Sequence, residues 1–157
     1  MTRIAVTGHR ALPPGAITPI AQRIRTHLEG LVPELTGVSC LADGADSLFA
    51  TEVVRLRGSL EVIVPATNYR GELPVEHHAT YDALCAQAAR VQRLTFVEST
   101  PQAHLTASEL MVDQADQLLA VWDGLPARGT GGTADVVAYA RSRNIPVTVV
   151  WPEGTVR

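Results

Sequence analysis

The stretch that decides the fold runs from Gln117 to Arg141 and reads QLLAVWDGLPARGTGGTADVVAYAR. It begins with Gln117–Trp122, an apolar run of strand length, and its later part carries Val136, Val137 and Ala140 at helical spacing. A loop rich in glycine and threonine separates the two. Strand, loop and helix in this order form the repeating unit of α/β proteins with parallel strands. The stretch therefore predicts that fold class.

The same order recurs along the whole chain. The apolar runs are rich in Val, Ile and Leu and mostly lack polar alternation, as expected for strands that are covered on both faces. We predict strands at Ile4–Thr7, Gly37–Leu41, Leu60–Val64, Arg93–Val97, Gln117–Trp122 and Val147–Trp151.

Helical patterns fill the gaps between these runs. Thr18-Pro19 is typical of a helix start, and Ile20, Ile24, Leu28 and Leu31 follow it on one face. Asp43 is predicted to cap the next helix. The alternation predicts an α/β fold: a single-domain, Rossmann-like three-layer sandwich over residues 1–157, with a mostly parallel sheet of about six strands.

Composition restricts the function. The chain has no lysine, its 13 arginines are scattered, and its net charge is −3, so no long nucleic acid is expected as a partner. No apolar run reaches membrane length, and the first strand begins too early for a signal peptide. Cys40 and Cys85 are interpreted as reduced core residues, which favours a cytoplasmic protein without membrane contact.

In such folds, ligands bind at the carboxyl ends of the strands. The segments that follow the strands are TGHRALPPG, LADGAD, PATNYRGE and WDGLPARGTGGTAD, and all are rich in Gly, Asp, Arg or Asn. We predict neither a metal site nor a cofactor. The predicted ligand-binding residues are Gly8, His9, Arg10, Asp43, Gly44, Asp46, Asn68, Asp123, Gly124, Gly129, Thr130, Gly131, Gly132 and Thr133.

The glycine-rich loop gives the strongest signal. Backbone N–H groups at a helix start form an anion site when no side chains block the approach. Gly129–Thr133 meets that condition, and its two threonines add hydroxyl donors. The alternative is a tight turn, but three glycines and two threonines exceed what one turn requires.

The charged residues each allow two interpretations. Arg10 is either a bidentate partner for phosphate or carboxylate, or a solvated loop residue. Asp43 and Asp46 have the spacing of a capping box, while Gly44 beside them leaves room for a ribose or phosphate. Asp135 either complements the positive end of its helix or acts as a carboxylate on a ribose or a glycosidic bond.

Three motifs together carry a family resemblance: VTGHR, CLADGADSLFA, and ADQLLAVWDG followed by GTGGTADVVAYAR. In this order they resemble the SLOG superfamily, the Rossmann-like group that includes the DNA-processing protein DprA and the lonely-guy phosphoribohydrolases. The resemblance implies a pocket for a nucleotide or nucleoside derivative. Gly132–Asp135 falls on the G-T-x-E part of the lonely-guy motif, which implies a catalytic role for Asp135. Such relatives commonly pair, so a homodimer is expected.

The sequence therefore favours a protein that binds a small nucleotide-like ligand. Phosphate is expected over Gly129–Thr133, flanked by Gly8 and Arg10, with the ribose near Asp135 or Asp46. One alternative is a hydrolase of N-glycosidic bonds that uses Asp135. Another is a protein-interaction domain in which the glycine loop is only structural.

Overall fold

The computed structural model describes residues 1–127 and 132–157. Its strands form one sheet in the order β4-β3-β2-β1-β5-β6, and all neighbouring strands are parallel. The predicted α/β fold with about six parallel strands is thus confirmed. The strands are β1 (Thr2–Gly8), β2 (Leu35–Ser39), β3 (Ser59–Ala66), β4 (Arg90–Phe96), β5 (Gln117–Val121) and β6 (Val147–Val150).

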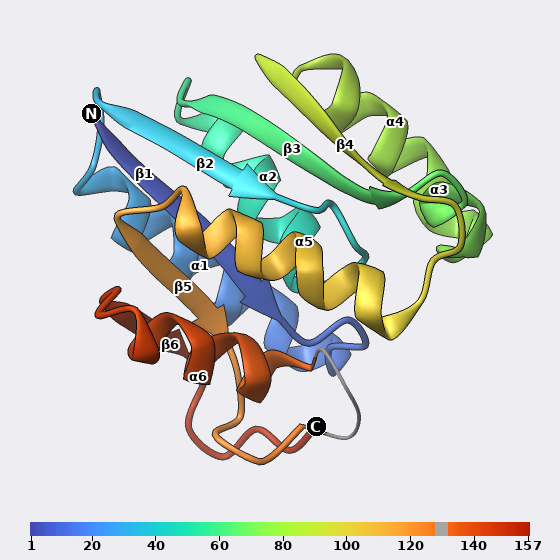
Figure 1. Ribbon diagram of the computed structural model, residues 1–157. Coiled ribbons are helices and arrows are strands. Elements are labelled where there is room, and N and C mark those ends of the chain that lie inside the picture. Colours follow the sequence, from blue (N-terminus) through green and yellow to red (C-terminus); the bar gives the residue numbers. More distant parts are fainter. Residues whose placement is uncertain (128–131) are drawn as a thin grey trace.

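Helices cover both faces of this sheet (Figure 1). They are α1 (Ile17–Glu29), α2 (Ala45–Arg55), α3 (Tyr69–Glu72), α4 (His78–Ala86), α5 (Pro101–Asp113) and α6 (Thr133–Ser142). Helices α1, α2 and α4 lie on one face, while α5 and α6 lie on the other. Among the described helices, none is long and apolar enough to cross a bilayer.

The core lies on both faces of the central strands. Ile4, Ala5 and Val6 of β1 are fully buried, because helices pack on both sides of this strand. Ile20, Ile24 and Leu28, three residues of the stripe predicted for α1, are also fully buried. Burial of one such side chain stabilises the fold by roughly 1.5–3 kcal/mol, so this stripe holds α1 on the sheet.

The boundaries of some elements differ from the predictions. Strand β4 begins at Arg90, earlier than predicted, and it is partly exposed because it lies at the edge of the sheet. Strand β2 ends at Ser39, because Leu41 has a φ of 59° that turns the chain away from the sheet. The predicted helix start at Thr18 is wrong, since a 3-10 turn at Pro14–Ala16 runs directly into α1.

The predicted cap at Asp43 is also wrong. Gly44 is the N-cap of α2, with a φ of 84° that side chains rarely allow, and no side chain caps the helix. A Cβ on Gly44 would collide with the backbone carbonyl of Arg10. The N–H of Ala45 donates to the carbonyl of His9 at 3.2 Å, so the first turn of α2 is fixed on the end of β1.

The strand order places a crevice beside β1. The chain proceeds outward from β1 to β4, and then returns through α5 to add β5 and β6 on the other side of β1. The connections therefore leave β1 and β5 towards opposite faces of the sheet. In open α/β sheets, ligands bind at such a reversal, at the carboxyl ends of the strands.

Candidate ligand-binding site

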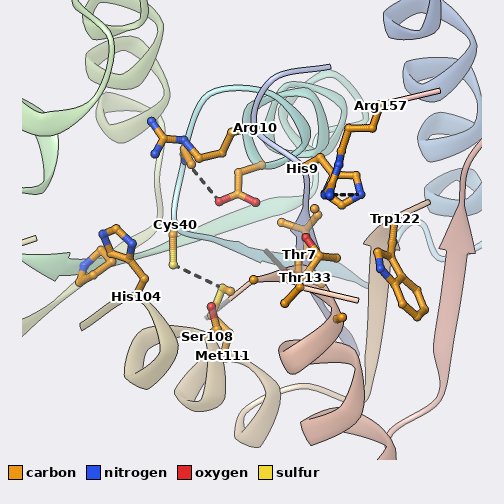
Figure 2. A pocket seen from close by; sticks show the side chains of 18 of the residues that line it. Thr7, His9, Arg10, Cys40, His104, Ser108, Met111, Trp122, Thr133 and Arg157 are labelled. Atoms are coloured by element: carbon orange, nitrogen blue, oxygen red, sulfur yellow. Dashed lines mark hydrogen bonds between the residues drawn. The ribbon is translucent and has the colours of Figure 1, made fainter. Parts of the chain in front are cut away.

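A cavity of about 320 Å³ lies at this reversal. Its walls come from the end of β1, the loop between β2 and α2, the end of β3, helix α5, the segment after β5, the start of α6 and Arg157 (Figure 2). The crevice predicted from the alternation of strands and helices is therefore lined by segments that are far apart in the sequence.

One wall combines a helix start with two hydroxyl groups. Thr133 is the first residue of α6, and no side chain caps this helix. Thr7, at the end of β1, also points into the cavity (Figure 2). Both threonines are more than nine-tenths buried, and neither hydroxyl has a hydrogen bond to any residue that the structure describes. The first N–H groups of a helix likewise have no partner within it. This wall can donate several hydrogen bonds to an anion.

Arg10 brings a positive charge to the rim. Its Nε and Nη2 atoms lie 2.9 Å and 2.7 Å from Oδ1 of Asp43, and its side chain is half exposed. Asp43 therefore orients a guanidinium group and does not cap α2. Because Arg10 lines the cavity while paired, it presents its remaining N–H groups to a ligand.

Asp46 is a cavity-lining carboxyl group in the first turn of α2. Its Oδ2 atom accepts a hydrogen bond from the N–H of Ala42 at 3.3 Å. Burial is the main cause that raises the pKa of Asp46 to about 7; Asp43 also acts to raise it, while the Ala42 N–H and Arg10 act to lower it. Near neutral pH this group both donates and accepts hydrogen bonds, depending on its proton.

Tyr69 and His104 form the wall across the cavity from α6. Tyr69 is buried at the start of α3, and its ring centroid lies 5.6 Å from that of His104, edge to face. Ser99 Oγ lies 2.7 Å from His104 Nε2. Burial, with Arg10 nearby, lowers the pKa of His104, which favours the neutral form of its imidazole. Nothing in the sequence indicated His104, because it lies on a helix that carries no binding motif.

His9 is buried behind the rim and connects distant segments. Nη1 of Arg157 lies 2.6 Å from Nδ1 of His9, and Nε2 of His9 lies 3.3 Å from Oδ1 of Asp123. A guanidinium group only donates, so Arg157 donates to a ring nitrogen of His9, and the backbone N–H of Asp123 donates to Nε2 of the same ring at 3.2 Å. Burial raises the pKa of Asp123, but the Leu125 N–H, His9 and Arg157 outweigh it, so this pKa lies below its usual value.

Some of the predicted ligand-binding residues line the cavity and others do not, and the binding role of all of them stays a prediction. Among the residues that the structure describes, the cavity is lined by Gly8, His9, Arg10, Asp46, Gly132 and Thr133. The remaining described ones lie beside or away from its lining: Asp43, Gly44, Asn68, Asp123 and Gly124.

Four further predicted site residues do not belong to the described lining of the cavity. Gly129, Thr130 and Gly131 lie outside the described residues. Asp135 is exposed in the first turn of α6 and does not belong to the described lining of the cavity. Its predicted catalytic role is therefore not tested by this geometry.

No protein-family model and no curated protein matches this sequence. Solved structures do match. DNA processing protein A from Streptococcus pneumoniae superposes with a TM-score of 0.71 and 14% identity, covering 98% of this chain and 52% of its own. Our chain thus spans about half the length of that protein. These neighbours are SLOG-type Rossmann-like proteins.

This chain shares the Rossmann-like fold of these proteins.

Two further structures with the SLOG-type fold extend the comparison. One is DNA processing protein A from Helicobacter pylori, described for its single-stranded DNA binding mode, with a TM-score of 0.69, 14% identity, and 98% and 67% coverage of the two chains. The other is a molybdenum cofactor binding protein from Rippkaea orientalis, with a TM-score of 0.61, 16% identity, and 94% and 75% coverage. At these identities the likeness concerns the fold.

Proposed function

We propose that this protein binds a phosphate-bearing small molecule, a nucleotide or nucleotide derivative, in the cavity between β1, β5 and α6. The observation that carries the proposal is the wall formed by Thr7, Thr133 and the start of α6. The hydroxyl groups of Thr7 and Thr133 face the cavity without a hydrogen bond to any described residue, so they are available to a ligand. A phosphate supplies acceptor oxygens for both hydroxyl groups and for the helix N–H groups at once.

The other walls suit the rest of such a ligand. Asp46 is placed to hydrogen-bond sugar hydroxyl groups, and Arg10 to pair with a second anionic group. The edge-to-face rings of Tyr69 and His104 offer an apolar surface with one polar edge for a base. A volume of about 320 Å³ lies within the range of small-molecule sites.

The alternative ligand is long single-stranded DNA, because one structural neighbour is described for its single-stranded DNA binding mode. We favour the small ligand because this chain has a net charge of −3 and no lysine. A cytoplasmic location, which suits its two free cysteines, belongs to the same proposal. The homodimer stays a prediction.

Two measurements test the proposed function: a search for ligand that stays bound during purification, and a comparison of nucleotide binding by a site variant and a control variant. Native mass spectrometry of gently purified protein should reveal a nucleotide-like mass, or a panel of nucleotides should raise the melting temperature. Thr133→Val removes one buried hydroxyl group at nearly constant volume, and we expect it to weaken nucleotide binding roughly tenfold.

Thr106→Val serves as the control for this loss. Thr106 is partly exposed on α5, outside the cavity lining, and its hydroxyl group donates to the carbonyl of Gln102. The control variant should bind like the wild type. If the wild type retains no such mass and no nucleotide raises its melting temperature, the proposal is wrong.

A further inference from the structure

The segment after β6 brings Arg157 back to the cavity. We propose that Arg157 is a ligand-binding residue whose guanidinium group pairs with a second negative charge on the ligand, so that the preferred ligand carries a diphosphate or an equivalent pair of charges. This inference rests on the proposed function and specifies the class of ligand.

The segment that carries Arg157 has a defined structure. The indole N–H of Trp151 donates to the carbonyl of Thr155 at 3.0 Å, and the N–H of Thr155 donates to the carbonyl of Pro152 at 3.2 Å. Arg23 of α1 donates to the carbonyl of Trp151 at 3.2 Å. These contacts form a turn anchored to α1, and that turn directs Arg157 towards the carboxyl ends of β1 and β5.

The contacts of Arg157 leave much of its hydrogen-bonding capacity unused. Its side chain is only 16% exposed, and within the described part of the chain its hydrogen bonds go from Nη1 to His9. Its Nε atom lies 3.4 Å from Oδ2 of Asp123, and both atoms are buried without a hydrogen bond to any described residue. A guanidinium group has five N–H donors, so several donors of Arg157 remain for a ligand.

The surroundings make this charge effective. The ring of Trp151 packs edge-on against the ring of His9, with 5.4 Å between the ring centroids, beside the contact of His9 with Arg157. Arg157 also belongs to the cavity lining, together with Thr133 and Arg10. A buried cation interacts with an anion more strongly than an exposed one, because less water screens the pair.

The positive groups therefore surround the cavity on several sides. The start of α6 supplies backbone N–H groups, Arg10 comes from the segment after β1, and Arg157 comes from the segment after β6. Within the described lining, the carboxyl group that offsets them is Asp46, and burial raises its pKa to about 7. Arg10 and Arg157 also pair with Asp43 and Asp123, which lie outside the lining, and these contacts leave N–H groups of both arginines unused. A nucleoside diphosphate offers anionic acceptors for those N–H groups, whereas a neutral nucleoside does not.

The experiment compares ADP, adenosine and inorganic pyrophosphate as probes by isothermal titration calorimetry. The wild type should bind ADP at least tenfold more tightly than adenosine. Arg157→Ala should weaken ADP binding roughly 10- to 100-fold and leave adenosine binding nearly unchanged. Arg157→Lys keeps the charge but loses the planar fork, so an intermediate loss is expected.

Arg143→Ala is the matched control, because Arg143 packs over the ring of Tyr139 at 5.0 Å, at the far end of α6. It should bind ADP like the wild type. If Arg157→Ala unfolds, Arg157→Gln and Arg157→Lys decide: equal ADP affinity in both and in the wild type would overturn the inference.

The outcomes separate the two proposals. Should Arg157→Ala bind ADP normally while Thr133→Val does not, the role of Arg157 is refuted and the proposed function stands. Binding of adenosine as tight as that of ADP would refute the charge-pair inference alone. If the wild type binds neither ADP nor pyrophosphate and no nucleotide affects it, both proposals fail.

Discussion

Asp46 is a single residue of the site whose ionisation destabilises the folded protein. Its pKa is raised to about 7 mainly by burial, whereas an exposed aspartate titrates near 4. The folded protein therefore holds this proton more tightly than the unfolded chain does. The resulting stabilisation is fully present below pH 4 and is lost as the pH rises to about 7.

We predict that Asp46→Asn stabilises the protein at high pH. The amide keeps an acceptor for the Ala42 N–H and carries no charge, so at pH 8 the free energy of unfolding should rise by up to about 4 kcal/mol. At pH 4 the variant and the wild type should be nearly equal. Urea unfolding between pH 4 and pH 8 measures this difference, and a constant difference across the range would contradict the raised pKa.

Sequence reasoning identified Asp46 but not its environment. The spacing of Asp43 and Asp46 suggested a capping box, while the structure pairs Asp43 with Arg10 and turns Asp46 into the cavity. The capping prediction failed because the backbone of Gly44 adopts a positive φ and packs on the carbonyls of His9 and Arg10. Such a contact between distant segments leaves no signal in a local spacing rule.

At the scale of elements, the site depends on how α2 packs against β1. A Cβ on Gly8 would collide with Cβ of Ala45 in α2 and would lie 2.8 Å from Cβ of Val121 in β5. Gly8 was predicted to let a ligand approach the backbone. The structure shows that the absence of a side chain at Gly8 lets a helix and a neighbouring strand approach, while the approach of a ligand stays a prediction.

We therefore predict that Gly8→Ala costs about 1–3 kcal/mol of unfolding free energy, as overpacked sites typically do. Gly15→Ala is the control, because a Cβ on Gly15 would meet no other atom within 4 Å. Chemical denaturation of both variants measures the effect. Equal stability of Gly8→Ala and the wild type would show that α2 is not held against β1 in this way.

The elements themselves were largely predictable. Val/Ile/Leu-rich runs in alternation with helical stripes marked the sheet, since burial on both faces requires such runs. Edge strand β4 was located less well, because Arg90 and Arg93 interrupt its apolar character and lower the contrast with the preceding loop. The predicted helix start at Thr18-Pro19 failed because the 3-10 turn before α1 moved the first helical residue to Ile17.

At the scale of the whole molecule, parallel strands explain why separate loops meet. All carboxyl ends lie at one edge of a parallel sheet, so the segments after β1, β2, β3 and β5 had to gather there. The roles of His104 and Arg157 could not be predicted in the same way. Arg157 and His9 are 148 residues apart, and only the return of the chain after β6 brings them together.

The measurement that tests the central claim most directly is a titration of the isotope-labelled protein with ADP, followed by the chemical shifts of its backbone amides. We predict saturable shifts that are largest at Thr7, Gly8, Thr133 and Ala134, around the start of α6 and the end of β1, with little change in α4. Saturable shifts confined to another surface, or no saturable shift with ADP or any other phosphate-bearing nucleotide, would contradict the claim that this cavity holds a phosphate.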